Sequence, residues 1–231
     1  MALSDDLETE VKAVFKAAWT DRDGQKVPEA EDISLGNNAV KLNATVLYAD
    51  LAESTTLVDG YKKDFAAEVY KTYLHCASKI IKSEGGVITA FDGDRVMGVF
   101  LGDSKNTSAA RCALKINHAV LKIINPAIKA QYSSTDYTVK HAVGIDTSDL
   151  YIARTGVRGS NDLVWVGRAA NYAAKLCSLR KASKASYITA TVYNKLDKAV
   201  KTSSDGQSMW ESSTWQEKGI TVYSSTWMWK P

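Results

Sequence analysis

A continuous apolar segment, residues 44–50, constrains the fold of this chain more than any other feature. It runs with little interruption by polar side chains until the acid at its end, Asp50. A strand with this pattern is buried on both faces, so its sheet needs other layers on either side. Ser54 and Thr55 open the next segment, in which apolar residues recur at helical spacing as far as Ile81. We therefore predict a central strand that is followed directly by a helix.

Strand and helix patterns alternate along the rest of the chain. Further strands are predicted at 40–42, 87–90, 96–100, 139–145, 151–154, 163–166, 186–191 and 220–229, and further helices at 4–18, 107–124, 167–179 and 192–200. Pro126 is expected to end the helix that begins at Thr107, and residues 21–38 are interpreted as a connection. This order predicts an α+β fold, a ferredoxin-like mixed and partly antiparallel sheet with packed helices. Residues 1–43 would form an N-terminal helix and connection, and residues 44–231 one domain.

The composition excludes several classes of protein. Of 231 residues, 45% are hydrophobic and 24% are charged, which is typical of a globular domain and not of a disordered chain. The net charge of +3 comes from lysines spread along the chain, so no nucleic-acid partner is expected. No signal peptide and no apolar run of about 18 residues is found, so no membrane partner is expected. Three cysteines far apart indicate a reduced protein, and we expect the cytoplasm.

Two acidic residues stand where strands end. Asp50 closes the central strand, and Asp94 directly follows the expected Asp92-Gly93 turn of the hairpin 87–100. If the two strands are neighbours, both carboxylates reach one edge of the sheet, where they could hold two Mg²⁺ or Mn²⁺ ions about 3.5–4 Å apart. Oxygen ligands favour these ions over zinc, and backbone amides at 52–55 would offer donors to phosphate. The alternative is that both acids are ordinary cap and turn residues.

Five motifs in register resemble the catalytic domain of class III nucleotidyl cyclases, the adenylate and guanylate cyclase family. They are Tyr48 to Thr55, Gly93-Asp94 with Met97 and Val99-Phe100, Val143-Gly144-Ile145, Gly167 with Asn171 and Lys175, and Lys218-Gly219. The resemblance implies a head-to-tail homodimer with two composite sites. In each site Asp50 and Asp94 of one subunit would bind the metals, while Asn171 and Lys175 of the other would orient the ribose and stabilise phosphate charge. The implied reaction is attack of the ribose 3′-oxygen on the α-phosphorus, with release of pyrophosphate.

The chain departs from the family pattern in ways that bear on the substrate. Lys175 stands where the family usually has Arg. Among the expected substrate-binding residues Leu51, Ala52, Glu53, Ser54 and Thr55, Glu53 replaces a usual glycine. The two positions that read the purine base in relatives are Ala90 and Val164, and neither side chain can hydrogen-bond a base edge. Tyr48, on the same strand face as Asp50, could stack on a smaller pyrimidine, or it could be a buried strand aromatic.

With apolar residues at both base-reading positions, the chain resembles the pyrimidine cyclases of the bacterial anti-phage system called Pycsar. The resemblance implies UTP as substrate, with CTP possible, and a cyclic product that acts on a separate nucleotide-sensing effector. Two alternatives stay open: a purine cyclase with an atypical base pocket, and a catalytically degenerate cyclase-like module that only binds nucleotides. Four tryptophans in the last 22 residues are expected to serve core or dimer packing.

Overall fold

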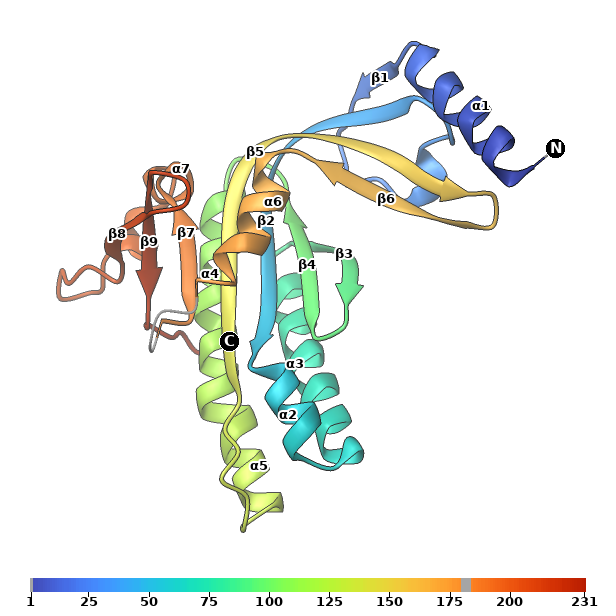
Figure 1. Cartoon of the computed structure of the whole chain (residues 1–231). Coiled ribbons are helices and arrows are strands. Elements are labelled where there is room, and N and C mark those ends of the chain that lie inside the picture. The colour runs from blue at the N-terminus through green and yellow to red at the C-terminus, as the bar shows by residue number, and fades with distance from the viewer. Residues whose placement is uncertain (1, 180–183) are drawn as a thin grey trace. The chain divides into compact units, whose positions relative to one another are not determined.

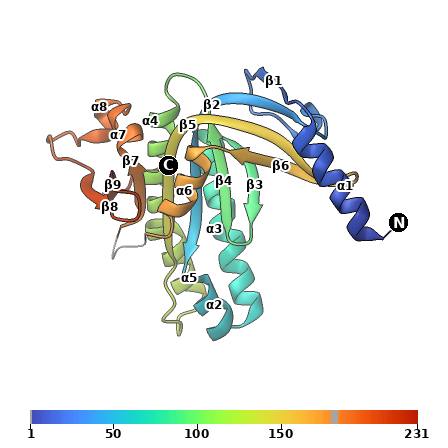
Figure 2. The same ribbon diagram turned by 45° about the horizontal axis from the view of Figure 1, so that its top comes forward.

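The computed structural model describes residues 2–179 and 184–231, which divide into two compact units. One unit combines the residues up to Asn43 with residues 149–167, and we call it the hairpin unit. The other, the core unit, combines residues 44–148 with residues 168–231. Strands β2 (Asn38–Ala52) and β5 (Lys140–Val157) each run from one unit into the other without a break (Figure 2).

A mixed sheet forms the centre of the core unit (Figure 1). Its strand order is β3-β4-β2-β5-β7-β9-β8, with β3 at Val87–Asp92, β4 at Arg95–Phe100, β7 at Ser186–Thr189, β8 at Glu211–Trp215 and β9 at Ile220–Ser225. Strands β5 and β7 are parallel, whereas β4 is antiparallel to both β2 and β3, and β9 is antiparallel to both β7 and β8. This arrangement confirms the predicted α+β class. Strand β8 was not predicted.

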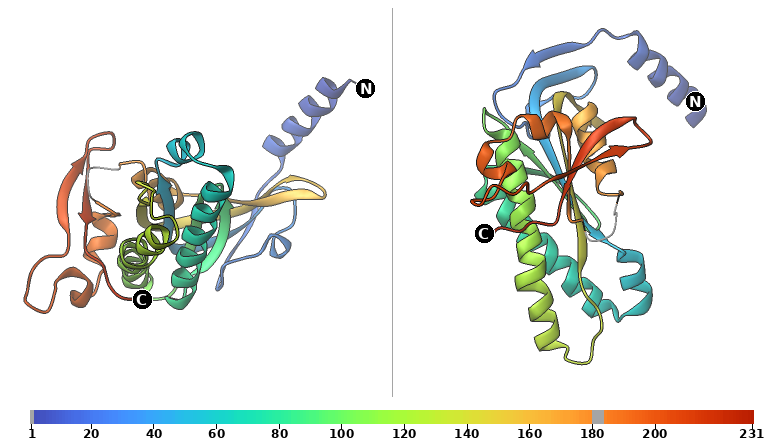
Figure 3. Two further views of the ribbon diagram at one scale, coloured as in Figure 1. Left: turned by 90° about the horizontal axis from the view of Figure 1, so that it is seen from below. Right: turned by 90° about the vertical axis from the view of Figure 1, so that its left-hand side faces the viewer.

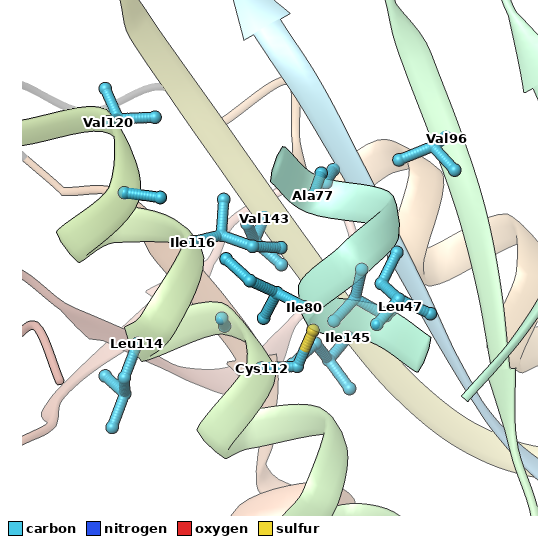
Figure 4. Packing of buried hydrophobic residues seen from close by; sticks show 14 of the residues in the cluster. Leu47, Ala77, Ile80, Val96, Cys112, Leu114, Ile116, Val120, Val143 and Ile145 are labelled. Atoms are coloured by element: carbon cyan, nitrogen blue, oxygen red, sulfur yellow. The ribbon is translucent and has the colours of Figure 1, made fainter. Parts of the chain in front are cut away.

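Helices cover both faces of this sheet. They are α2 (Ser54–Gly60), α3 (Lys63–Ser83), α4 (Lys105–Ala119), α5 (Asn125–Gln131), α6 (Arg168–Leu176), α7 (Ala190–Asn194) and α8 (Lys198–Lys201). Helices α3 and α4 lie on one face and α6 on the other (Figures 1 and 3). Leu47 and Ile145 of the sheet pack against Ile80 of α3 and Cys112 of α4, and all four are buried (Figure 4). On the α6 face, Leu176 packs in a second cluster with Tyr187, Trp215 and Val222.

Two predicted element ends are wrong. Pro126 does not stop the helical chain, because α4 continues through a π-helical turn at Val120–Ile124 into α5. Pro126 directly follows that π-helical turn, in the first turn of α5, where its fixed φ suits the helical backbone. The last strand ends at Ser225 and not at Trp229, because the following residues bind α4. Asn117 Nδ2 donates to the carbonyls of Thr226 and Trp227, each at 3.0 Å, and both Trp227 and Trp229 pack partly buried on the core.

The hairpin unit contains two further strands. Strand β1 (Thr20–Asp23) pairs parallel to the first part of β2, although most of its residues had been interpreted as part of a connection. Strand β6 (Ser160–Val166) pairs antiparallel to the second half of β5. The predicted strands 139–145 and 151–154 are therefore one strand, β5. Helix α1 (Leu3–Lys16) has no buried residue, and a short 3₁₀ turn spans Ala30–Asp32. None of the helices in the described part of the chain is long and apolar enough to cross a bilayer.

Candidate active site

The two acids lie on neighbouring strands of the core unit. Strand β2 pairs with β4 so that Asp50 is opposite Arg95, and the Leu51 amide donates to the Asp94 carbonyl at 3.4 Å. Asp92 pairs with Arg95, so the hairpin turn is Gly93-Asp94 and not Asp92-Gly93 as predicted. Gly93 has a φ of +60°, which a glycine at the first turn position of a type II′ hairpin adopts without strain. Asp94 is therefore in the turn itself, beside the end of β2.

The environment of these carboxylates fits a hard divalent cation. The Oδ2 atom of Asp94 is buried and has no hydrogen-bond partner, and Asp50 is only 9% exposed. A buried carboxylate oxygen without a donor is costly, so a bound cation would relieve that cost. Residues 2–179 and 184–231 hold no group of three or more His, Cys, Asp or Glu side chains suited to a metal. Asp50, Asp94 and the neighbouring backbone carbonyls offer oxygen ligands, which Mg²⁺ and Mn²⁺ prefer.

Arg95 joins this site, and sequence reasoning missed it. Its guanidinium carbon lies 5.2 Å from the centroid of the Tyr48 ring, and its Nη2 donates to Asp92 Oδ2 at 2.5 Å. Its Nε is buried without a hydrogen-bond partner. Burial alone would lower the pKa of Arg95, but the hydrogen bond to Asp92 and the charge of Asp50 raise it. Arg95 is therefore a fixed cation with an unused donor. The only sequence signal was its place directly after Asp94.

Tyr48 and Ala90 share a sheet face with Asp50. Tyr48 is opposite Met97, which in turn is opposite Ala90, and residues directly opposite in a sheet point to the same side. Tyr48 and Ala90 are both half-buried. Burial raises the pKa of the Tyr48 hydroxyl, which stays protonated at neutral pH. The face therefore combines a small apolar residue, an aromatic ring and the Arg95 guanidinium next to the two acids.

Glu53, in the loop after β2, has an unusual backbone conformation. Glu53 has φ 61° and ψ 30°, a left-handed conformation that a glycine adopts easily and a residue with a Cβ does not. Its carboxylate binds Lys140 Nζ, which lies 3.1 Å and 3.0 Å from its two oxygens. Leu51 is fully buried in the α3 and α4 core, so it can offer only its backbone to a ligand.

The remaining loop residues follow Glu53 into α2. Ala52 ends β2, and Ser54 and Thr55 are the first residues of α2, which is seven residues long. A helix this short contributes little macrodipole, so phosphate binding by the amides at 52–55 stays a prediction.

Asn171 and Lys175 are both exposed on α6. They are four residues apart, so they lie on one side of the helix. Within the chain, Lys175 Nζ binds Glu217 Oε1 at 2.8 Å, and this hydrogen bond raises the pKa of Lys175. Val164 belongs to the hairpin unit, where it is exposed on β6 opposite Ala153. The structure thus brings Tyr48, Asp50, Ala90, Asp94 and Arg95 together, whereas the roles of Asn171, Lys175 and Val164 stay predictions.

Comparisons with known proteins give close relatives over the whole chain. No family model matches the sequence. A protein named uridylate cyclase from Burkholderia cepacia is 56% identical over 99% of this chain and 99% of its own length. Another of that name from Xanthomonas perforans is 53% identical over 100% of this chain and 99% of its own length.

Solved structures of cyclases share the fold. The adenylyl cyclase CyaB from P. aeruginosa superposes with a TM-score of 0.66 over 81% of this chain and 95% of that chain, at 20% identity. A dimeric guanylyl cyclase domain from the fungus Blastocladiella emersonii gives a TM-score of 0.61 over 80% of this chain and 97% of that chain, at 14% identity.

Proposed function

The chain belongs to the uridylate cyclase family, and from this we propose that it converts UTP to 3′,5′-cyclic UMP and pyrophosphate. The observation that carries the proposal is the shared sheet face on which Arg95 and Tyr48 adjoin Asp50 and Asp94. This face would combine a place for a pyrimidine ring with two carboxylates suited to a metal-bound triphosphate.

Asp50 and Asp94 would hold two divalent ions, Mn²⁺ or Mg²⁺. Bound there, such ions supply charge neutralisation and activation of the attacking oxygen. The support is the buried Asp94 Oδ2 that has no hydrogen-bond donor. Glu53 is paired with Lys140 and is not assigned to the metal ions.

The ribose and phosphates would be handled by a second subunit. In the proposed head-to-tail homodimer, Asn171 of the second subunit orients the ribose so that its 3′-oxygen faces the α-phosphorus. Lys175 of that subunit then stabilises the negative charge that develops on the phosphates. Exposure of both side chains on α6 supports this role, since residues that serve another subunit must be accessible. Lys175 would have to leave Glu217 to reach a phosphate.

Arg95 would favour uracil over cytosine by facing position 4 of the pyrimidine ring. A guanidinium only donates hydrogen bonds, and uracil presents the O2 and O4 carbonyls as acceptors. At position 4 cytosine has an amino group, which is also a donor, so it would face Arg95 unfavourably there, although its O2 and N3 still accept hydrogen bonds. Tyr48 would stack on the ring, and Ala90 leaves no polar group to read a purine edge. The product would act on a separate nucleotide-sensing effector, as in the anti-phage systems that the sequence resembles.

Incubation of the protein with each of the four ribonucleoside triphosphates and Mn²⁺ tests this proposal. Cyclic UMP should be the main product, and Asp50→Asn should abolish it. Arg95→Lys should lower kcat/KM for UTP about tenfold or more, since a lysine cannot keep the same planar donors. A main product from ATP or GTP would favour a purine cyclase instead. No cyclic product from any nucleotide would favour a binding-only module.

A further inference from the structure

Three alternate residues of strand β5 hold helix α6 on the sheet. They are Gly144, Asp146 and Ser148, and residues two apart on a strand point to the same face. The Ser148 hydroxyl accepts a hydrogen bond from the Ala169 amide at 2.9 Å, which gives a partner to one N–H group in the first turn of α6. Each of the three makes a different kind of contact with α6.

Gly144 sets how closely α6 approaches the sheet. A Cβ at this position would lie 2.1 Å from the Ala173 carbonyl oxygen and 2.8 Å from the Leu176 Cβ. No side chain fits there, so the helix rests directly on the strand backbone. Ala169 and Ala173, fully buried, face the strand with side chains small enough for this contact.

Asp146 and Arg168 form a fork at the start of α6. Arg168 Nε donates to Asp146 Oδ2 at 2.9 Å, and Arg168 Nη2 donates to Asp146 Oδ1 at 3.3 Å. The Thr189 hydroxyl also donates to Asp146, at 2.5 Å, and Nη2 reaches the Thr147 carbonyl at 2.9 Å. The Asp146 side chain is 0% exposed. Because the buried Asp146 carboxylate depends on the Arg168 and Thr189 donors, moving Arg168 away would leave a desolvated charge without its partner. The pair therefore favours one position of Arg168.

Arg168 lies on the same helical stripe as the two residues assigned to the reaction. Asn171 and Lys175 follow it by three and seven positions, which is one side of an α-helix. A rotation of α6 that carried Asn171 and Lys175 away would also pull Arg168 from Asp146. The fork therefore fixes the rotation of the helix, while Gly144 fixes its height above the sheet.

We propose that Asp146 and Arg168 are positioning residues for the cyclase reaction, which act by fixing the rotation of α6 and thereby the placement of Asn171 and Lys175. This inference rests on the proposed function, in which α6 serves the site of the other subunit. Neither residue touches the substrate.

Arg111 provides a matched control. It binds Glu84 through Nε at 2.8 Å, and its side-chain exposure of 39% resembles the 43% of Arg168. Glu84 is buried like Asp146, with a side-chain exposure of 7%. This pair joins the C-terminal cap of α3 to α4, and none of its contacts among the described residues involves α6. Arg111→Lys and Arg168→Lys thus each replace an arginine that binds a buried carboxylate, Arg111 through Nε alone and Arg168 through two nitrogens. Of the two arginines, only Arg168 lies next to the proposed reaction residues.

Steady-state kinetics with UTP and hydrogen exchange compare the two full-length variants. Arg168→Lys should lower kcat about 10- to 100-fold with a KM within about twofold, since small misplacements of reacting groups act on the chemical step. Amide exchange in residues 169–176 should rise about tenfold. Arg111→Lys should leave both unchanged. Unchanged kcat and unchanged α6 exchange in Arg168→Lys would overturn the inference.

Mixed dimers, purified with two tags, separate this inference from the composite site. Asp50→Ala paired with Asn171→Ala is the control and should recover about half of the wild-type activity. Asp50→Ala paired with Arg168→Lys should recover the same half, because one site then has intact acids and an intact α6. If the control recovers and this second pair does not, the positioning role is wrong. If the control fails, the composite site is wrong, and the exchange data alone decide the role of Arg168.

Discussion

Glu53 offers a sharp test of the local geometry beside the acids. Among the described residues it is the one non-glycine residue with a positive φ. Left-handed backbone costs a residue with a Cβ about 1–2 kcal/mol relative to glycine. Glu53→Gly and Glu53→Ala both remove the ion pair with Lys140, so their difference isolates the backbone conformation. We expect the glycine variant to be more stable than the alanine variant by about 1 kcal/mol.

A second position provides a control, because there the alanine variant should be more stable than the glycine variant. Lys71 is exposed within α3, where glycine costs about 1 kcal/mol relative to alanine. In a chain of this size 1 kcal/mol corresponds to about 2–4 °C in Tm. Thermal unfolding of the four variants should therefore rank glycine above alanine at 53 and below it at 71. The same order at both positions would refute the left-handed assignment of Glu53.

Three further predictions concern buried titratable side chains. Asp94→Asn should raise the Tm of the metal-free protein, because Oδ2 is buried without a donor, and should abolish activity. Burial lowers the pKa of His141 to about 4 from 6.5, so the folded state binds fewer protons than the unfolded state. The stability from this group is complete above pH 6.5 and falls as pH drops towards 4, by about 2 kcal/mol at pH 5, and urea unfolding of wild type and His141→Gln should show that difference. Glu84→Gln should cost about 3 kcal/mol in the same assay, because it leaves Arg111 and Lys115 without their shared carboxylate.

The sequence predicted the parts of the fold that bury apolar runs. The strand ending at Asp50 and the hairpin carrying Asp94 were both found, because their side-chain patterns reflect burial on the sheet. Strand β8 was missed because only Trp215 of its five residues is buried, and β1 because all four of its residues are exposed. Edge strands are held by backbone hydrogen bonds, which leave no apolar pattern in the sequence.

The site was predictable where a residue acts through its own chemistry. Asp50 lies near the end of β2 and Asp94 in the turn before β4, and the expected pairing of β2 with β4 puts the two acids on neighbouring parts of the sheet. Arg95 was missed because its position in the site depends on strand register, which the sequence does not show. Its pairing opposite Asp50 puts its guanidinium over the Tyr48 ring. Glu53 was unexplained because a backbone angle, invisible in a sequence, makes its position one that suits glycine.

The two-part composition of the hairpin unit bears on how the chain is made. Asn43 Nδ2 donates to Asp149 Oδ1 across a sequence separation of 106 residues. At a synthesis rate of about 5–20 residues per second, the first segment waits roughly 5–20 s on the ribosome for its partner. The hairpin unit is therefore completed after β3 and β4 have been synthesised and before β7, β8 and β9. A truncated chain that starts at residue 44 would lack the part of the hairpin unit that ends at Asn43. Ile152, which is fully buried in the complete structure, would then lose part of its own unit.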